Sequence, residues 1–327
     1  MIISKTPFRI SFFGGGTDYP AWYEKNQGAV LSTTIDKYCY ISLRYLPPFF
    51  EHKHRIVYSL IENVKEISEI RHPVVRALLD YCKIKEGIEL HHDGDLPARA
   101  GLGSSSAFTV GMINSLHALN GKIISKANLA KEAIFVEREL LKESVGSQDQ
   151  VAVSYGGLNK ISFNNDHSFK VEPMTLPKER LNQLQEHLML IFTGLSHNAS
   201  LIAAEQIKNT ANKNKELSAM RQMVDQAVDI LNRGEDITKF GKLLHESWQI
   251  KKSLASKISS SFIDDIYEAA IKNGAVGGKL LGAGGGGFML LFVLPEKRQK
   301  IKEGLKDLLE VKFAFENEGS QIIYYNP

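Results

Sequence analysis

A glycine-rich turn and three serine hydroxyls fall within residues 97–107, where an apolar helix is expected to begin. The first backbone N–H groups of a helix have no partner within it and carry the positive end of its dipole, so they attract anions. Glycines let the main chain approach an anion, and serines supply capping and metal-ligand oxygens. An ordinary serine-capped helix start is the alternative interpretation. The pattern predicts a nucleotide-phosphate site made by Gly101, Leu102, Gly103, Ser104, Ser105 and Ser106.

The spacing in this turn argues against the common nucleotide-binding loops. No Gly-Lys-Ser/Thr follows a four-residue spacer, as a Walker loop requires. No Gly-x-Gly-x-x-Gly opens a strand-turn-helix unit with an acidic residue about 20 positions later. Walker and Rossmann folds are therefore disfavoured.

Two further glycine segments accompany the first one. Residues 7–19 form an alternating strand that ends in three glycines, a hydroxyl and a carboxylate. Residues 278–288 form a denser glycine turn between two apolar strands. A flexible hairpin would explain either segment taken alone.

Glu137 is a carboxylate on an apolar helical stripe. It shares one face with Ala133, Val136 and Leu140, because positions three and four apart lie on the same side of a helix. A charge in that place needs a partner, and the sequence leaves two possible partners. Arg138 or another base could pair with it near the rim of the core. Alternatively, Glu137 binds Mg²⁺ that arrives with ATP, since this ion takes one or two carboxylates with phosphate oxygens and water.

The composition fits a soluble globular enzyme. The 327 residues are 43% hydrophobic and 24% charged, which is enough for a sizeable core divided between two domains. The net charge is only +3, and no basic run is interleaved with aromatic residues, so we expect no nucleic-acid partner.

The chain carries no sign of export or of membrane insertion. Cys39 and Cys82 are its two cysteines, and we expect both to be reduced core residues. The first residues lack the build of a signal peptide, and no apolar stretch approaches about 18 residues. We therefore expect a cytoplasmic protein without a membrane partner, either a monomer or a homodimer.

Hydrophobic periodicity predicts mixed helices and strands. Strands are expected within residues 2–46, including 29–35 and 39–43, and at 88–92, 157–163 and 188–192. Helices are expected at 74–81, 105–119, 127–141 with Ser125 as its cap, 198–212, 216–232, 238–255 and 262–272. After the last glycine turn come a strand, a helix and two short strands. The link between domains is expected at 173–185.

The three glycine segments, in this order, resemble those of the GHMP kinase superfamily, which includes galactokinase, homoserine kinase, mevalonate kinase and phosphomevalonate kinase. The resemblance runs from about Ile3 to the final strand. It implies an α+β fold of two domains with MgATP lying across the serine loop. Residues 1–175 would form the ATP-binding domain, similar to domain 2 of ribosomal protein S5, and residues 176–327 a ferredoxin-like domain.

The resemblance also assigns roles to single residues. Asp149 lies in a segment similar to the Gly-x-x-Asp-Gln motif of the superfamily, and there it would accept the proton of the acceptor hydroxyl. Arg9 stands where galactokinases carry an arginine close to that aspartate. Ser105 and Glu137 look like the magnesium ligands. Without the resemblance, Asp149 would be a helix N-terminal residue and Arg9 a surface residue at a strand edge.

The first glycine segment bears on the choice of acceptor. Galactokinases have Gly-Glu-His-Thr-Asp-Tyr where this chain has Gly14 to Tyr19 with three glycines. The Gly-Gly-Gly-Thr-Asp form resembles the D-glycero-D-manno-heptose 7-phosphate kinases, which phosphorylate the anomeric hydroxyl to give a 1,7-bisphosphate for nucleotide-activated heptose. A kinase for another sugar, or for an isoprenoid or amino-acid alcohol, is the alternative, and a sensor without turnover is a third. The expected substrate-binding residues are Gly15, Gly16, Thr17, Asp18, Gly284, Gly285 and His197, the last standing where many relatives have arginine.

Overall fold

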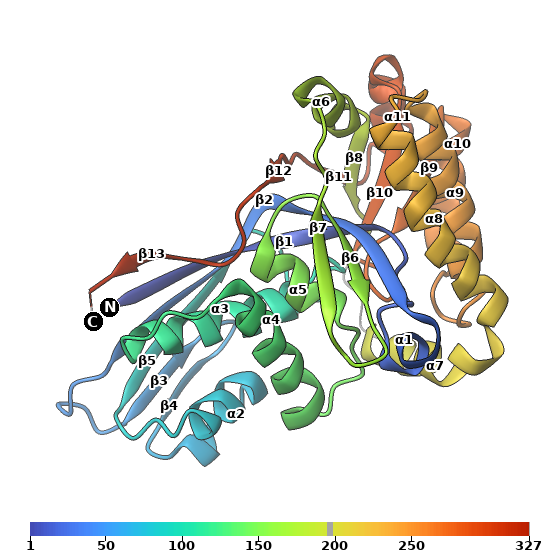
Figure 1. Cartoon of the computed structure of the whole chain (residues 1–327). Coiled ribbons are helices and arrows are strands. Elements are labelled where there is room, and N and C mark those ends of the chain that lie inside the picture. The colour runs from blue at the N-terminus through green and yellow to red at the C-terminus, as the bar shows by residue number, and fades with distance from the viewer. Residues whose placement is uncertain (195–198, 327) are drawn as a thin grey trace.

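Two β-sheets with flanking helices make up the chain in the computed structural model, which describes residues 1–194 and 199–326 (Figure 1). Within these ranges the larger sheet has nine strands in the order β13-β1-β2-β5-β3-β4, with β12 and β6 also on β2 and β7 on β6. Its strands are β1 Ile2–Phe13, β2 Gly28–Tyr45, β3 His54–Val57, β4 Ile61–Val64, β5 Ile88–Gly94, β6 Asn159–Phe163, β7 Phe169–Pro173, β12 Phe315–Glu316 and β13 Gln321–Tyr325.

The smaller sheet is antiparallel and has the order β11-β8-β10-β9 in the described residues. Strand β10 is buried along its whole length, as expected for a strand covered on both faces. Helices of the C-terminal half lie beside this sheet in Figure 1. The predicted α+β architecture is confirmed. The strands are β8 Leu188–Phe192, β9 Ala275–Leu280, β10 Phe288–Val293 and β11 Leu309–Val311.

The helices predicted at 74–81, 105–119, 216–232, 238–255 and 262–272 are present with shifts of a few residues at their ends, whereas the helices Pro20–Asn26, Gln148–Tyr155 and Lys178–Glu186 lie outside the predicted positions. Those before β8 are α1 Pro20–Asn26, η1 Ile67–Glu69, α2 Pro73–Tyr81, α3 Ser104–Leu119, α4 Lys126–Phe135, η2 Val136–Leu140, α5 Gln148–Tyr155 and α6 Lys178–Glu186. Those after it are α7 Ala199–Asn209, η3 Thr210–Asn212, α8 Asn214–Asn232, α9 Thr238–Lys252, α10 Ser261–Lys272, η4 Pro295–Lys297 and α11 Arg298–Gly304. No helix in the described part of the chain is long and apolar enough to cross a membrane.

Helix α3 is the central helix of the first half. Twelve of its 16 residues are buried, so it is covered on nearly all sides rather than amphipathic. It approaches β1 closely, since a Cβ on Gly111 would lie 2.9 Å from Thr6 Oγ1. The N-terminus of α3 is therefore fixed relative to the strand that carries Arg9.

Aromatic contacts join the two halves in one core. The ring of Phe240 on α9 meets Phe12 and Phe13 of β1 edge to face, at centroid distances of 5.5 and 5.1 Å. All three side chains are fully buried. The end of β1, just before the first glycine segment, is thus packed against the C-terminal half.

The helix predicted over 127–141 does not run unbroken. Ser125 caps α4 as expected, because its Oγ accepts the N–H of Asn128 at 3.2 Å, but α4 ends at Phe135. A single π-helical turn, η2, follows and contains Glu137. Such wide turns insert an extra residue and occur often at functional sites.

Two predictions about chain organisation need correction. The expected link at 173–185 contains helix α6, so only residues 174–177 connect β7 to it. The expected strands at 29–35 and 39–43 are parts of one long strand, β2, whose pairing with β1 shifts register at two places.

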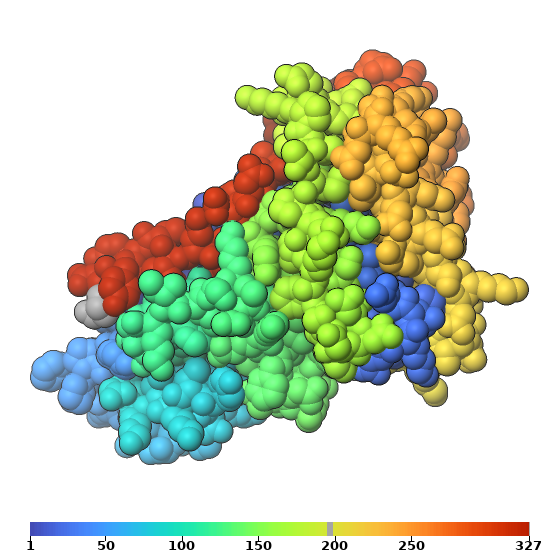
Figure 2. Space-filling view, in the orientation of Figure 1, coloured from blue at the N-terminus to red at the C-terminus, as the bar shows by residue number. Residues whose placement is uncertain are grey.

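The last strands run back to the larger sheet, where β12 pairs with β2 and β13 with β1. Figure 2 shows this terminal segment, in red, lying along the N-terminal half. The range 176–327 therefore includes strands of the first sheet. We propose to keep the domain boundary near residue 176, with β12 and β13 assigned to the N-terminal domain.

Candidate active site

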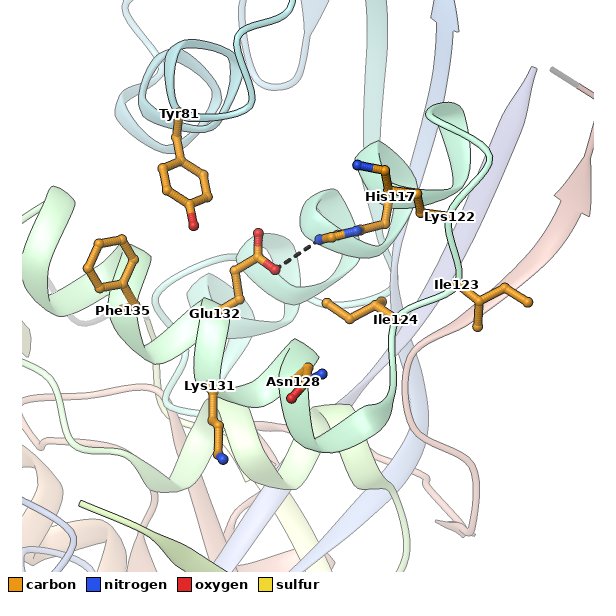
Figure 3. A pocket seen from close by; sticks show the side chains of 9 residues that line it. All are labelled: Tyr81, His117, Lys122, Ile123, Ile124, Asn128, Lys131, Glu132 and Phe135. Atoms are coloured by element: carbon orange, nitrogen blue, oxygen red, sulfur yellow. Dashed lines mark hydrogen bonds and ion pairs between the residues drawn. The ribbon is translucent and has the colours of Figure 1, made fainter. Parts of the chain in front are cut away.

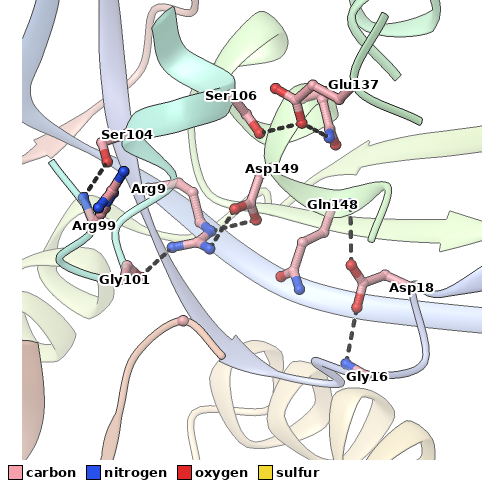
Figure 4. A network of polar contacts seen from close by, with 12 residues as sticks. Arg9, Gly16, Asp18, Arg99, Gly101, Ser104, Ser106, Glu137, Gln148 and Asp149 are labelled. Carbon is pink, nitrogen blue, oxygen red and sulfur yellow. Dashed lines mark hydrogen bonds and ion pairs between the residues drawn. The ribbon is translucent and has the colours of Figure 1, made fainter. Parts of the chain in front are cut away.

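Arg9 and Asp149 form a bidentate ion pair at the centre of the candidate site (Figure 4). Arg9 Nε donates to Asp149 Oδ1 at 2.8 Å, and Nη2 donates to Oδ2 at 2.7 Å. The arginine side chain is 4% exposed, whereas that of Asp149 is 24% exposed. Two parallel bonds fix both the position and the rotation of the carboxylate. Asp149 is held rigidly and is still open to a ligand.

The predicted nucleotide-phosphate site at residues 101–106, here called the phosphate loop, is bonded to this ion pair. Arg9 Nη1 donates to the carbonyl of Gly101 at 2.8 Å, and the Arg9 N–H donates to the carbonyl of Leu102 at 3.0 Å. Gly103 has φ +73°, and a Cβ there would lie 3.4 Å from Asp149 Oδ2. Ser104 Oγ accepts the N–H of Arg99 at 3.3 Å and so closes the turn. One arginine thereby sets the distance between the loop at the start of α3 and the carboxylate on α5.

Glu137 is fully buried beside the start of α3. Ser106 Oγ donates to its Oε2 at 3.0 Å, and Gln150 Nε2 donates to the same oxygen. Burial is the main cause that raises the pKa of Glu137 to about 7. Its other oxygen, Oε1, is buried without a hydrogen-bond partner among the described residues.

This unpartnered oxygen fits a cation brought with the nucleotide. The described residues hold no cluster of three or more His, Cys, Asp or Glu side chains that could bind a metal by themselves. Mg²⁺ does not need such a cluster, because it keeps water and phosphate oxygens and takes one or two carboxylates. Of the two predicted ligands, the structure places Glu137 beside Ser106, whereas Ser105 is exposed and makes no hydrogen bond to Glu137.

The loop after β1 is built around Asp18, which is 2% exposed. Asp18 Oδ1 accepts the N–H of Gly16 at 2.9 Å, and Oδ2 accepts the N–H of Gln148 at 3.3 Å. Burial, and then the nearby charge of Asp149, raise the pKa of Asp18. A Cβ on Gly146 would lie 1.9 Å from Asp18 Oδ2, so that position must lack a side chain. The loop and the start of α5 are therefore joined through one carboxylate.

Thr17 and Gln148 complete the same loop. The Thr17 hydroxyl is fully buried and lies 2.7 Å from the carbonyl oxygen of Gly14 and 2.9 Å from that of Ala29, and it donates its proton to this pair. It therefore shapes the loop. Gln148 extends between Asp18 and Asp149 in Figure 4, and its Oε1 is buried without a partner among the described residues. In the sequence, only its position next to Asp149 indicated that Gln148 belongs to the candidate site.

The last glycine turn packs directly on the phosphate loop. The Phe288 N–H donates to the carbonyl of Ala100 at 3.1 Å, and a Cβ on Gly282 would lie 2.5 Å from the Cα of Gly101. Gly285 donates its N–H to the carbonyl of Ile258 at 2.9 Å, and a Cβ on Gly284 would lie 2.7 Å from the Cα of Ile258. The three glycine segments thus lie next to one another in the structure. His197 lies outside the described residues.

Sequence reasoning missed two buried lysines beside this turn, Lys251 on α9 and Lys279 on β9. Lys279 lies in the strand that leads into the glycine turn, and Lys251 shares a helix stripe with Leu244 and Trp248. A charged residue on an apolar stripe was the available signal in both cases.

A separate pocket of about 710 Å³ lies between α2, the end of α3 and α4 (Figure 3). The ion pair of His117 and Glu132, at 2.9 Å, crosses it. None of the candidate site residues lines it. Its lining residues are Tyr81, His117, Lys122, Ile123, Ile124, Asn128, Lys131, Glu132 and Phe135.

Comparison with known proteins agrees with this geometry. Family models described as the GHMP kinases N terminal domain and the GHMP kinases C terminal match residues 67–157 and 219–311. The chain is 31% identical to D-glycero-alpha-D-manno-heptose 7-phosphate kinase of Campylobacter jejuni, over 97% of each chain. It is 28% identical to galactokinase of Pyrococcus furiosus, over 96% of this chain and 95% of that one.

A solved structure shares the fold over the full length of both chains. It is that of a D-glycero-D-manno-heptose 1-phosphate kinase from Bacteroides thetaiotaomicron, with a TM-score of 0.82 and 20% identity. The two matched family models and the full-length relative agree on one assignment: this chain belongs to the GHMP kinases.

Proposed function

We propose that this ATP-dependent sugar kinase phosphorylates the anomeric hydroxyl of D-glycero-D-manno-heptose 7-phosphate to give the 1,7-bisphosphate. The similarity to a heptose 7-phosphate kinase over 97% of both chains carries the choice of substrate. The Arg9–Asp149 pair beside the phosphate loop supports phosphoryl transfer at this place. Such a product would serve the synthesis of nucleotide-activated heptose in the cytoplasm.

Asp149 would act as the proton acceptor. As the sugar oxygen forms its bond to the γ-phosphorus and the bond to the bridging oxygen of ADP breaks, the hydroxyl proton passes to a carboxylate oxygen of Asp149. Arg9 would hold that carboxylate in place and place a positive charge near the transferred group. Phosphoryl transfer needs positioning and charge neutralisation more than covalent chemistry, and both are supplied by this pair.

The nucleotide phosphates would lie on the loop from Gly101 to Ser106. Mg²⁺ bound with ATP would neutralise phosphate charge, and Glu137 with Ser106 or Ser105 would hold it. The buried, unpartnered Oε1 of Glu137 supports this assignment.

The sugar would lie against the loop from Gly14 to Asp18. Gly15 lies next to Gln148, since a Cβ on Gly15 would lie 3.7 Å from Gln148 Nε2, and Gly16 lies against Leu217, since a Cβ there would lie 3.2 Å from Leu217 Cδ2. Asp18, with Gln148 beside it, would bind sugar hydroxyls, whereas Thr17 would shape the loop. Gly284 and Gly285 would close the other side, and His197 is proposed to contact the substrate phosphate.

A kinase for a non-phosphorylated sugar is the second candidate. It is favoured by the similarity to a galactokinase over 96% of the chain. The absence of the Glu-His pair at residues 15 and 16 argues against galactose itself.

A substrate panel separates the two candidates. The protein is incubated with ATP, Mg²⁺ and one of heptose 7-phosphate, heptose, galactose, fucose or mevalonate, and products are identified by mass and ³¹P NMR. We expect turnover with heptose 7-phosphate and a new anomeric phosphate signal. Faster phosphorylation of galactose or fucose would contradict the proposal.

A further inference from the structure

Two lysine side chains are buried next to the site without an acidic hydrogen-bond partner in the described residues. Lys251 is 7% exposed and Lys279 is 2% exposed. Within the described part of the chain, the hydrogen bonds of both ammonium groups go to main-chain carbonyls, and Lys251 Nζ also lies 5.9 Å from the centre of the Trp248 ring. Lys251 Nζ donates to Leu280 O at 2.9 Å and to Gly282 O at 2.6 Å, and Lys279 Nζ donates to Phe12 O at 2.9 Å.

Burying a cation in this way costs stability. Burial lowers the pKa of Lys279 to about 7 and that of Lys251 well below its usual value, and the cations Arg9, Lys251 and Lys279 repel one another. Asp18 is the nearby carboxylate that favours the charged form of Lys279. A hydrophobic residue of similar length would avoid the cost, as substitutions of buried charges elsewhere show. Lysines that cost stability at a site point to a functional role.

Each lysine bonds to the main chain of a different segment of the site. Lys251 fixes the carbonyls on both sides of Leu281, and that segment touches the phosphate loop, because a Cβ on Gly101 would lie 2.6 Å from Leu281 O. Lys279 fixes the carbonyl of Phe12, two residues before the glycines of the sugar loop. One lysine therefore acts on the nucleotide side and the other on the sugar side.

We propose that Lys251 and Lys279 are positioning residues that hold the last glycine turn and the loop after β1 in register with the phosphate loop. Neither touches a substrate. Lys251 sets the geometry of the nucleotide site, and Lys279 sets that of the sugar site. The assignment of the two loops rests on the proposed function.

The test compares Lys251→Met and Lys279→Met with Lys252→Met. Lys252 is the neighbour of Lys251 on α9, and it pairs with Asp264 at 3.1 Å on the outer side. Methionine keeps the length of the side chain and removes the charge and the donor. Melting temperature establishes that each variant folds, and kinetics with saturating second substrate give KM for ATP and for the sugar separately.

We expect each of the two variants to raise a different Michaelis constant. Loss of a bond to a buried carbonyl should change the affected constant by about tenfold or more. Lys251→Met should raise KM for ATP and weaken binding of AMP-PNP with Mg²⁺ in calorimetry. Lys279→Met should raise KM for the sugar while AMP-PNP binding stays near that of the wild type. Lys252→Met should match the wild type throughout.

Folded variants with wild-type constants, or equal changes in both constants, would overturn the proposal, since a merely structural role predicts those results. The binding of AMP-PNP tests Lys251 without any sugar. The kinetic arm uses whichever sugar the panel shows to be phosphorylated, so a wrong substrate assignment does not decide the outcome for the lysines.

Discussion

At the scale of single residues, the geometry of Asp149 depends on a neighbour 140 positions away in sequence. Two bonds from Arg9 orient the carboxylate, and the same guanidinium reaches the phosphate loop through Gly101 O. The proposed proton acceptor and the proposed phosphate loop are therefore positioned by one side chain. A change at Arg9 would disturb both, whereas a change at Asp149 can be confined to proton transfer.

We predict that Asp149→Asn lowers kcat by about 10²-fold or more while leaving binding of AMP-PNP with Mg²⁺ within about twofold. The amide keeps the shape and a hydrogen-bond acceptor for Arg9 but is a far weaker base. Single-turnover kinetics and calorimetry measure the two quantities. Asp229→Asn on the exposed face of α8 is the control. A turnover number close to that of the wild type would refute the role of Asp149.

Lys279 gives a prediction on pH and stability. Its folded-state pKa of about 7 lies below the unfolded value, so between about pH 7 and 10.5 the unfolded chain binds the extra proton. The cost of burying the charge is fully present below pH 7 and declines as pH rises through that window. We predict that Lys279→Met gains stability relative to wild type near pH 7, and that this gain shrinks by a few kcal/mol toward pH 10.

Urea unfolding of both proteins at pH 7 and pH 9.5 measures this difference, and titrating groups that do not interact with Lys279 cancel in the comparison. A difference between variant and wild type that stays constant over the two pH values would show that the lysine is not destabilised by burial.

Among the elements, the start of α3 and the turn η2 would together form the proposed metal site. Helix α3 supplies Ser105 and Ser106 in succession, and a helix turns them to different sides, so only Ser106 meets Glu137. The resemblance assigns the hydroxyl ligand to Ser105 because it is the second serine after the Gly-Leu-Gly turn. Which hydroxyl faces the carboxylate depends on where the helix begins and on the π turn, and neither follows from spacing alone.

We predict that Glu137→Gln raises the Mg²⁺ concentration for half-maximal activity by about tenfold or more, since it removes a charged ligand. Ser105→Ala and Ser106→Ala then identify the hydroxyl ligand. The serine variant that shifts the Mg²⁺ titration lacks the hydroxyl ligand, and the other serine variant acts as its control. Overlay of all three titrations with the wild type would place the metal elsewhere.

Much of the element order could be predicted from hydrophobic periods, because α8, α10 and β8 each bury one face or both faces in a regular way. The glycine segments follow from local patterns, whereas Arg9 and Asp149 follow from the resemblance to the GHMP kinases, and the structure brings them together. Lys251 and Lys279 could not be assigned in this way, since their partners are carbonyls of distant segments. The strands that pair with β12 and β13 could not be predicted from the sequence either, because strand pairing depends on the whole fold.

At the scale of the molecule, one aromatic cluster couples the two sheets. Phe240 on α9 contacts Phe12 and Phe13 at the end of β1, directly before the loop from Gly14 to Asp18, and its ring centre lies 6.2 Å from that of Phe292 on β10. The two halves therefore share a core rather than an exposed hinge. We infer that they unfold together.

We predict that Phe240→Ala destabilises the protein by about 3–5 kcal/mol, because it removes a fully buried ring and leaves a cavity. Unfolding in urea, followed by circular dichroism and by tryptophan fluorescence, should give one coincident transition at a lower midpoint. Phe262→Ala on α10, where the ring is 55% exposed, is the matched control and should change stability little. Separate transitions for the two probes in the wild type would contradict a shared core.

The pairing of β1 with β13 bears on how the protein is made. Ile2 pairs with Tyr325, so β1 is synthesised long before the strand that it pairs with. Strand β1 can therefore form a hairpin with β2 before β13 leaves the ribosome. Until then the outer backbone edge of β1 is open, and a strand edge of this kind can pair with another nascent chain. The arrival of residues 321–325 closes that edge within the same molecule. Slow translation before this segment should therefore increase aggregation on the polysome, and prompt completion should suppress it.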